Sequence, residues 1–289
     1  MKVLILGGLG NLGSQLVVSG QQLGHEIISW DQAEVDLTDW SIAETKLANH
    51  QFDILINAVA YNLVDACETQ PGQNLAYVLN RDLVGHLASW CRLHNTMLVH
   101  YSSDYVFAGD QLTGYAETDQ PAPINEYGRS KLAGEQAIIQ EGELGLNYYL
   151  IRTSKLFGSR GSSLVTKPSF FDIMLKLSTT EPELTGVDAE ESCFTYIPDL
   201  AQATWQLLTD KLPKGIYHIV NSQPATWYQA LQKLHQLANL TVPFRSITST
   251  DLPRPAARPQ HSVLLMNKLP ALRPYHQALA EYLKNLLDN

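Results

Sequence analysis

The chain has 289 residues, of which 45% are hydrophobic, so it can bury one large core or two lobes. Its formal net charge is −9, and no basic cluster stands out, which argues against a nucleic-acid partner. The three cysteines are widely spaced and odd in number, as expected of buried thiols in a reducing compartment. The apolar run before Gly7 is too short for a signal peptide or a membrane span. We therefore expect a cytoplasmic protein without a membrane partner.

An apolar run, a glycine-rich turn and a helical segment open the chain. Lys2–Leu6 is typical of a strand buried on both faces of a parallel sheet, and Ser14–Leu23 has helical character. Gly7, Gly10 and Gly13 lie between them. In such a turn the first glycine permits the bend, the second lets the backbone approach a pyrophosphate, and the third lets helix pack on strand. Because the helix N-terminus then faces the phosphates, we expect a dinucleotide here.

A second strand, His25–Trp30, ends at Asp31. An acid at this distance from the glycines can accept hydrogen bonds from the adenosine ribose, and it would repel a 2′-phosphate. Asp31 therefore favours NADH over NADPH. The alternative is that Asp31 only begins a surface turn. Asp36 could reach the adenine amino group, and a helix is expected over Ser41–His50.

Two further strands, Phe52–Ile56 and Thr96–Tyr101, enclose a long helical pattern over Asn74–His94. The small residues of Asn57–Tyr61 follow the first of these strands, at the sheet edge where ligands bind in open α/β folds. Asn80, inside the helical pattern, could bond to a neighbouring strand or be solvated, and the sequence leaves both readings open.

A pair of hydroxyls, Ser102 and Ser103, follows the strand at Thr96–Tyr101. Tyr127 and Lys131 are four residues apart, so on a helix they share one face. An ammonium so placed lowers the pKa of a phenol, and such a tyrosine can exchange a proton with a carbonyl or alcohol. The serine hydroxyl would hold the same substrate oxygen. The pattern predicts hydride-transfer chemistry, although a tyrosine and lysine at this spacing also occur by chance.

The remaining chain continues the alternation and then becomes irregular. Strands are expected at Asn147–Arg152 and Gly215–Val220, helices at Phe170–Leu177, Ile197–Leu208, Thr226–Ala238 and Tyr275–Leu287, and loops at Ala108–Pro123, Ser159–Ser169 and Thr248–Gln260. The predicted fold is α/β, a Rossmann-type doubly wound parallel sheet with a smaller mixed α/β C-terminal lobe. Residues 1–158 would bind the dinucleotide, with 196–220 returning to that domain, and 159–195 with 221–289 would form the substrate lobe.

Several runs carry a resemblance to a known family. In chain order they are Gly7-x-x-Gly10-x-x-Gly13, Asn57–Glu68, Tyr101–Gly109, Tyr127–Glu135, Arg152-Thr153-Ser154 and Arg258-Pro259-x-x-Ser262. Together they resemble the dTDP-4-dehydrorhamnose reductases of the extended short-chain dehydrogenase/reductase superfamily. The likeness spans nearly the whole chain and is densest in residues 1–158.

The resemblance implies a nicotinamide-dependent reduction of a 4-keto sugar nucleotide. Tyr127 would give a proton to the C4 oxygen, Lys131 would hold the nicotinamide ribose, and Ser103 stands where the family usually has threonine. The implied cofactor-binding residues are Gly7, Gly10, Asn11, Leu12, Gly13, Asp31, Asp36, Leu37, Val59, Ala60, Tyr61, Ser102, Tyr127 and Lys131. The implied substrate-binding residues are Ser103, Asp104, Lys155 and Arg258, the last on a diphosphate.

The chain departs from the family pattern in the substrate lobe. Lys155 replaces the usual tryptophan of the sugar pocket, and Ala189–Thr195 retains only the threonine of the family's Asp-Gln-x-Gly-x-Pro-Thr segment. Ser169-Phe170 stands for Asn-Phe, after a longer loop. Some members use a metal held by an acid at the position of Gln15, so we expect no metal here. The cofactor motifs are intact.

Two alternatives remain open. One is a sugar-nucleotide epimerase or dehydratase of the same superfamily, although Asp104 lacks the accompanying glutamate of a dehydratase. The other is a non-catalytic NAD(P)-binding subunit resembling the regulatory subunit of methionine adenosyltransferase. The expected partners are a nucleotide sugar and, in a homodimer, a second copy of the chain.

Overall fold

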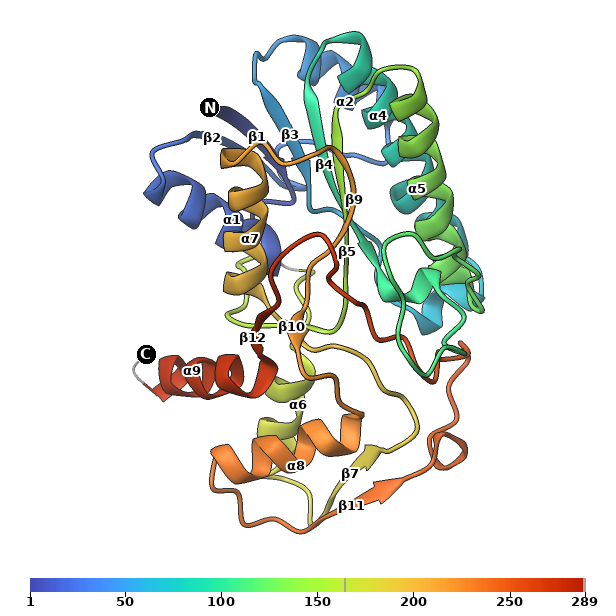
Figure 1. The fold of residues 1–289 in the computed structure, drawn as a ribbon, viewed down its shortest axis with the longest axis vertical. Helices are drawn as coiled ribbons and strands as arrows, with labels where there is room; N and C mark the ends of the chain where they lie inside the picture. Colours follow the sequence, from blue (N-terminus) through green and yellow to red (C-terminus); the bar gives the residue numbers. More distant parts are fainter. Residues whose placement is uncertain (164, 288–289) are drawn as a thin grey trace.

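The computed structural model describes residues 1–163 and 165–287. In this part of the chain the central sheet has six strands, all parallel, in the order β2-β1-β3-β4-β5-β9 (Figure 1). The strands are β1 (Lys2–Leu6), β2 (Glu26–Trp30), β3 (Ile54–Asn57), β4 (Met97–Ser103), β5 (Tyr148–Thr153) and β9 (Gly215–His218).

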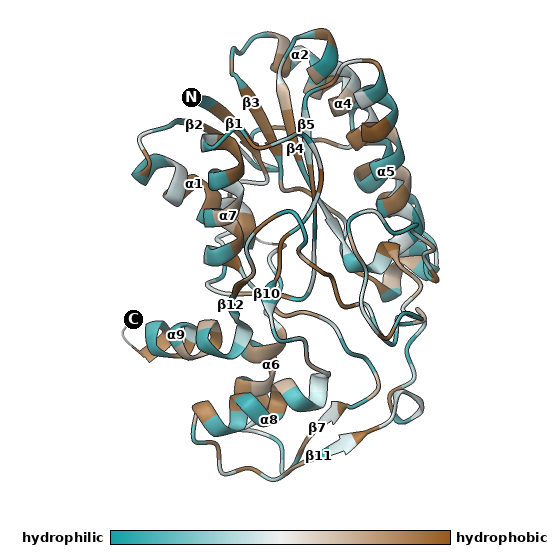
Figure 2. Ribbon diagram, in the orientation of Figure 1, coloured by the Kyte–Doolittle hydropathy of each residue, from teal (hydrophilic) through white to brown (hydrophobic). Residues whose placement is uncertain are grey.

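Helices cover both faces of this sheet (Figure 1). They are α1 (Asn11–Gln22) and α7 (Ile197–Thr209) on one face, and α2 (Trp40–Ala48), α4 (Leu83–Leu93) and α5 (Glu126–Glu143) on the other. Successive strand residues point to opposite faces, so Val3 and Ile5 pack under α1 and α7 while Leu4 and Leu6 pack under α2 and α4. The apolar strands lie between these helices (Figure 2), and the doubly wound fold is confirmed.

A smaller lobe lies beyond the carboxyl ends of the strands (Figure 1). Its helices are α6 (Phe170–Leu177), α8 (Trp227–Leu237) and α9 (Tyr275–Leu287), and its parallel strand pairs are β7 (Leu184–Val187) with β11 (Phe244–Ile247), β6 (Leu156–Phe157) with β8 (Thr195–Tyr196), and β10 (Asn221–Ser222) with β12 (Leu272–Pro274). An aromatic core that includes Phe157, Phe171, Phe194 and Tyr282 holds these pieces together. The predicted mixed α/β lobe is thus present.

The strand order places the switch point of the sheet at β1. β1 pairs with β2 on one side and with β3 on the other, so the loops that follow β1 and β3 leave in opposite directions. In open α/β sheets, ligands bind in the crevice that this divergence creates. The glycine turn follows β1, residues 58–61 follow β3, and Ser103 ends β4 at the same edge.

Several predicted elements differ from the structure, and three of the differences bear on the site. β4 runs on to Ser103 because Ser102 and Ser103 pair with Arg152 and Thr153 of β5. α1 begins at Asn11, directly after Gly10, and not at Ser14.

The predicted helix Asn74–His94 is divided into α3 (Gly72–Tyr77), a π-turn at Val78–Asp82, and α4. The π-turn carries the buried Asn80, whose hydrogen bonds leave the helix. Short 3-10 turns lie at Asp65–Glu68, Asp104–Val106 and Ser249–Asp251. Within the described residues, no helix is long and apolar enough to cross a membrane.

Candidate active site

The glycine turn has the geometry that a dinucleotide requires. Gly7 has a φ of +77°, in the left-handed region that favours glycine. A Cβ on Gly13 would lie 2.0 Å from the carbonyl oxygen of Gly7, so only glycine lets α1 start this close to the turn. Gly10 is the N-cap of α1 and supplies no side-chain cap. The backbone N–H groups of the first helical turn therefore carry the partial positive charge that attracts a phosphate.

A loop from the second half of the chain lies on this turn. We call residues 159–163 and 165–169 the strap; Leu164, which also falls in the predicted loop Ser159–Ser169, lies outside the described residues. Asn11 Oδ1 accepts a hydrogen bond from Gly161 N at 2.9 Å, and Asn11 Nδ2 donates to Lys167 O at 2.9 Å. The Asn11 side chain, predicted to contact pyrophosphate, thus holds the strap against the turn. Leu12, beside it, is buried under the sheet.

The acid after β2 also faces the glycine turn. Asp31 accepts hydrogen bonds from Leu9 N at 3.0 Å and from the Ser163 hydroxyl of the strap at 3.3 Å. Asp36 is exposed, and its hydrogen bonds from Thr38 lower its pKa. Leu37 packs on the core at the side of α2. The structure therefore brings Asp31 to the turn and leaves Asp36 in solvent.

The segment after β3 is held by a residue that the sequence left unassigned. Asn80 is fully buried, and its Oδ1 accepts from Tyr61 N while its Nδ2 donates to Tyr61 O, both at 2.9 Å. Its Nδ2 also lies 3.0 Å from Ser130 Oγ on α5. A Cβ on Gly7 would meet Val59 Cγ2 at 3.0 Å, so this segment touches the glycine turn. Asn80 thus fixes the predicted cofactor loop Val59–Tyr61, including Ala60, between the turn and α5.

The start of α5 brings the tyrosine to the end of β4. Asn125 caps the helix through a hydrogen bond from Gly128 N to Asn125 Oδ1 at 2.8 Å. A Cβ on Gly128 would lie 2.1 Å from Tyr105 O, so the first helical turn packs directly on the exit of β4. Tyr127 there hydrogen-bonds to the Ser103 hydroxyl. These two groups therefore meet at the end of β4.

The other two polar residues in this region point elsewhere. Ser102 is buried, and its hydroxyl has no hydrogen-bond partner among the described residues. Lys131 is 1% exposed, and its Nζ donates to Tyr101 O at 2.7 Å and lies 3.3 Å from His100 Nε2. Burial lowers the pKa of Lys131 to about 8. The lysine is thus directed toward β4.

The prediction that Lys131 lowers the pKa of Tyr127 is wrong for this structure. Burial raises the pKa of Tyr127, and only its hydrogen bond with the Ser103 hydroxyl opposes that shift. The reason is geometric, because Lys131 Nζ lies against Tyr101 O and His100 of β4. Tyr127 is therefore a protonated phenol at neutral pH, which is the form that donates a proton.

Asp104 lies in the interior beside the Ser103 hydroxyl. Its carboxylate accepts hydrogen bonds from the hydroxyls of Ser103 at 3.1 Å, Ser262 at 2.6 Å, and Ser154. Burial raises its pKa, and these hydroxyls oppose that change. Ser262 follows the predicted loop Thr248–Gln260, so Asp104 ties this part of the chain to the end of β4.

Lys155 is a cation enclosed by aromatic rings. Its backbone has a φ of +39°, which is uncommon for any residue other than glycine. Its Nζ lies 3.9 Å from the Trp227 ring centroid and 4.7 Å from that of Phe194. Burial lowers its pKa to about 8. Lys155 interacts with the Asp104 charge, so the structure places it near the candidate site.

Arg258 already has a carboxylate partner. Its Nη2 donates to Asp65 Oδ2 at 2.8 Å and its Nη1 to Ala256 O at 2.8 Å. The ion pair joins the predicted loop Thr248–Gln260 to the segment after β3. Arg258 thus lies beside the segment after β3, and its contact with a diphosphate stays a prediction.

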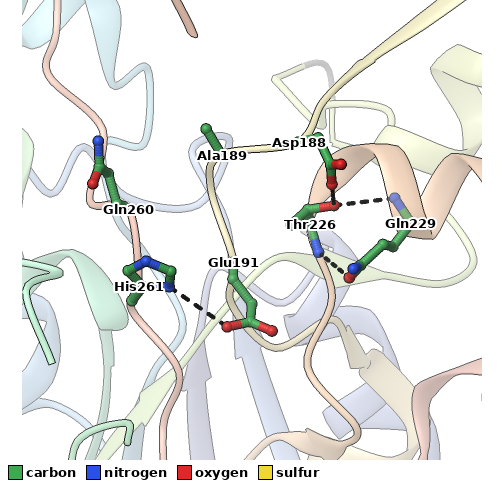
Figure 3. Close-up of a pocket in the computed structure, with 7 residues that line it drawn as sticks. All are labelled: Asp188, Ala189, Glu191, Thr226, Gln229, Gln260 and His261. Carbon is green, nitrogen blue, oxygen red and sulfur yellow. Dashed lines mark hydrogen bonds and ion pairs between the residues drawn. The ribbon is translucent and has the colours of Figure 1, made fainter. Parts of the chain in front are cut away.

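The divergent segment Ala189–Thr195 borders a shallow polar hollow of about 430 Å³ (Figure 3). Two acids that line the hollow already have partners: Asp188 accepts a hydrogen bond from Thr226 Oγ1 at 2.6 Å, and Glu191 lies 3.6 Å from His261 Nδ1. Glu190 points away from this hollow, toward Arg254. Among the described residues, no group of three or more His, Cys, Asp or Glu could hold a metal ion.

Comparisons with known proteins match this geometry. The sequence model of the family described as "RmlD substrate binding domain" matches residues 1–288. A dTDP-4-dehydrorhamnose reductase of Streptomyces griseus is 31% identical over 96% of this chain and 91% of its own length. The chain belongs to the dTDP-4-dehydrorhamnose reductase family. A second relative, the spore coat polysaccharide biosynthesis protein SpsK of Bacillus subtilis, is 33% identical over 98% of this chain and 97% of its own length.

A solved structure supports the family assignment. The dTDP-4-dehydrorhamnose reductase of Bacillus anthracis, in complex with NADP, superposes with a TM-score of 0.90 at 30% identity, covering 98% of this chain and 99% of that one. As a member of this family, the chain is an oxidoreductase of the short-chain dehydrogenase/reductase type, as predicted from the sequence.

Proposed function

We propose that this chain reduces a nucleotide-linked 4-keto sugar, with a nicotinamide dinucleotide as hydride donor. The observation that carries the proposal is the meeting of Ser103 and Tyr127 at the end of β4, with Lys131 one helical turn further on. The glycine turn lies at the same sheet edge. The substrate class is supported by the Streptomyces griseus relative, whose name gives that reaction.

The residues present fit a dinucleotide. A Cβ on Gly10 would meet only the carbonyl oxygen of Gly7, at 3.1 Å, so no side chain stands between the turn and a phosphate in that direction. When bound, the cofactor would supply the hydride to the carbonyl carbon. Gly7, Gly13 and the α1 N-terminus would hold its pyrophosphate, Asp31 its adenosine ribose, and Val59–Tyr61 its nicotinamide half. The buried and unpaired hydroxyl of Ser102 would be available to the same group.

Proton delivery follows from the hydroxyl pair. Ser103 Oγ would hold the substrate oxygen, and the Tyr127 phenol would release its proton to that oxygen as negative charge develops there. Because burial raises the pKa of Tyr127, the phenol keeps its proton until the substrate oxygen becomes the stronger base. Lys131 would bind the nicotinamide ribose.

We further propose that NADH is the preferred donor. The carboxylate of Asp31 faces the glycine turn, and a 2′-phosphate beside it would be repelled. The Bacillus anthracis relative holds NADP, so the choice needs a direct test. An Asp31→Ser variant should raise kcat/KM for NADPH relative to NADH by about tenfold. An unchanged ratio would remove Asp31 as the determinant.

The two parts of the chain would bind different molecules. Residues 1–158 with 196–220 would bind the cofactor, and 159–195 with 221–289 would bind the sugar nucleotide. Asp104, Lys155 and Arg258 face the substrate side in this proposal. The enzyme would act in the cytoplasm.

The test is oxidation of NADH and NADPH against a panel of 4-keto-6-deoxy nucleotide sugars. Turnover with at least one sugar supports the proposal. Absence of turnover with every sugar, in a protein that binds NADH tightly, would contradict it. An epimerase would instead retain NAD⁺ through purification and isomerise sugars without net oxidation. A regulatory subunit would co-purify with a larger enzyme and turn over no sugar.

A further inference from the structure

Two buried polar residues connect the cofactor loop to Lys131. Asn57 and His100 are partners in the parallel pairing of β3 with β4, so their side chains lie next to each other on one face of the sheet. Both are 1% exposed. Asn57 Nδ2 lies 3.1 Å from His100 Nδ1, and His100 Nε2 lies 3.3 Å from Lys131 Nζ. The three side chains form a continuous row inside the protein.

The orientation of the Asn57 amide is fixed by the backbone. Asn57 Oδ1 accepts a hydrogen bond from Val59 N at 3.1 Å. Reversing the amide would place its NH₂ group against that N–H, so the NH₂ must face His100. Nδ1 of His100 therefore accepts a hydrogen bond and carries no proton. The imidazole is neutral, in agreement with burial and Lys131, which both hold the pKa of His100 well below its usual range.

A neutral His100 with a bare Nδ1 carries its hydrogen on Nε2. That N–H points at Lys131 Nζ, and among the described residues Nε2 has no other partner. An ammonium has no lone pair to accept this hydrogen bond, whereas an amine has one. When Lys131 is protonated, the buried Nε2–H is left without an acceptor, which is unfavourable.

We propose that Asn57 and His100 are positioning residues for Lys131: the His100 Nε2–H, whose direction Asn57 fixes, favours the amine form of Lys131 over its ammonium. This inference rests on the proposed function. In the reduction, the Tyr127 O–H bond breaks and the substrate O–H bond forms. Tyr127 regains its proton from solvent. Separately, as the pH rises, a Lys131 N–H bond breaks and its proton passes to solvent. The resulting amine accepts the His100 Nε2–H, and a solvent proton later restores the ammonium.

The other groups around Lys131 set the background for this effect. Tyr127 and Glu135 lie on its own helix, and the Glu135 charge favours the ammonium. Glu135 is itself bound by Arg152 of β5, with Nη2 to Oε2 at 2.6 Å. On β4, Tyr101 O accepts from Nζ and His100 opposes it. His100 is thus the neighbour that favours loss of the proton.

Nitrogen NMR of protein labelled with ¹⁵N-histidine tests the tautomer without any substrate. Between pH 6 and 9, the expected result is one histidine that stays neutral, bears its proton on Nε2, and disappears from the spectrum in His100→Gln. A proton on Nδ1, or an imidazolium at pH 7, would overturn the inference. Since no sugar is needed, this result is separate from the success or failure of the proposed reaction.

Two variants test the effect on Lys131. In Asn57→Asp the carboxylate would take a proton on Nδ1, which turns the Nε2 lone pair toward the ammonium. In His100→Phe the Nε2–H is absent. In both, the alkaline limb of the kcat–pH profile should move up by about one pH unit. His25→Phe, which removes a histidine packed on Trp205, should leave the limb in place. If either folded variant leaves the limb unmoved, the inference fails, and if neither folds, the NMR result decides.

Discussion

The ammonium of Lys155 lies 3.9 Å from the ring centroid of Trp227. The Phe194 ring packs against Trp227 and is the second aromatic ring in contact with this ammonium. Cation–π contacts of this kind contribute roughly 0.5–2 kcal/mol. Among the described residues, the Lys155 side chain forms one long hydrogen bond, 3.4 Å to Glu190 O, and no carboxylate forms an ion pair with it. The aromatic rings therefore hold a cation whose hydrogen-bonding capacity is largely available to a ligand.

Replacing Lys155 with methionine should weaken binding of the sugar nucleotide. Methionine keeps the length of the side chain and removes the charge. A hydrogen bond to a charged group contributes roughly 1.5–3 kcal/mol, so KM for the sugar should rise by about tenfold or more, with KM for NADH unchanged. Steady-state kinetics measure both. Lys233→Met, at a half-buried lysine of α8 whose hydrogen bond to Gln236 is exposed, is the matched control. Equal sugar KM values in the two variants would contradict the role.

The buried pair of Glu135 and Arg152 should be needed for folding. Glu135 is fully buried, and Arg152 Nε and Nη2 donate to it at 3.0 and 2.6 Å. Glu135→Gln leaves a buried guanidinium without its counter-charge, so we expect the free energy of unfolding to fall by about 3–5 kcal/mol in urea denaturation. The control is Glu183→Gln, which breaks the exposed pair with Arg245 and should change stability by less than about 1 kcal/mol. Similar losses in both would show that burial of the pair is unimportant.

The order of elements could be predicted from the sequence because strand and helix periods are local. Contacts between residues of neighbouring parallel strands could not be predicted, because they depend on strand register. Asn57 and His100 are neighbours only through the β3–β4 register, and the hydrogen bonds of Asn80 to Tyr61 depend on how α4 packs. The polar character of these residues within apolar segments was the available signal. The position of the strap on Asn11 depends on the return of the chain after β5, which no local pattern encodes.

Asn80 should stabilise both the fold and the cofactor loop. Asn80→Ala removes its three side-chain hydrogen bonds and leaves Tyr61 N and O without their partners. We expect the free energy of unfolding to drop by roughly 2–4 kcal/mol, and NADH affinity to fall as the loop loosens. Urea denaturation and fluorescence titration measure the two effects. Asn49→Ala, at the exposed C-cap of α2, should lower stability by less than about 1 kcal/mol. Unchanged NADH binding in Asn80→Ala would separate Asn80 from the cofactor loop.

Lys131 should make stability rise with pH. Burial lowers its pKa from 10.5 to about 8, so between these values the unfolded chain holds a proton that the folded chain does not. Stability therefore increases with pH in that window and is flat with respect to this group below it. From pH 7.5 to 9.5, the free energy of unfolding of the wild type should gain about 2 kcal/mol relative to Lys131→Met. A constant difference between the two proteins would show that the folded lysine titrates normally.

The most direct test of the account follows the hydride itself. The wild type and Tyr127→Phe would be incubated with NADH carrying deuterium at C4 and with a 4-keto-6-deoxy nucleotide sugar that the panel identifies. Mass spectrometry of the product would locate the label. We predict deuterium at C4 of the sugar with the wild type, and a rate lower by about 10²–10⁴ with Tyr127→Phe at unchanged NADH affinity. An unlabelled product, or an equal rate in the variant, would contradict the proposed reduction or its proton donor.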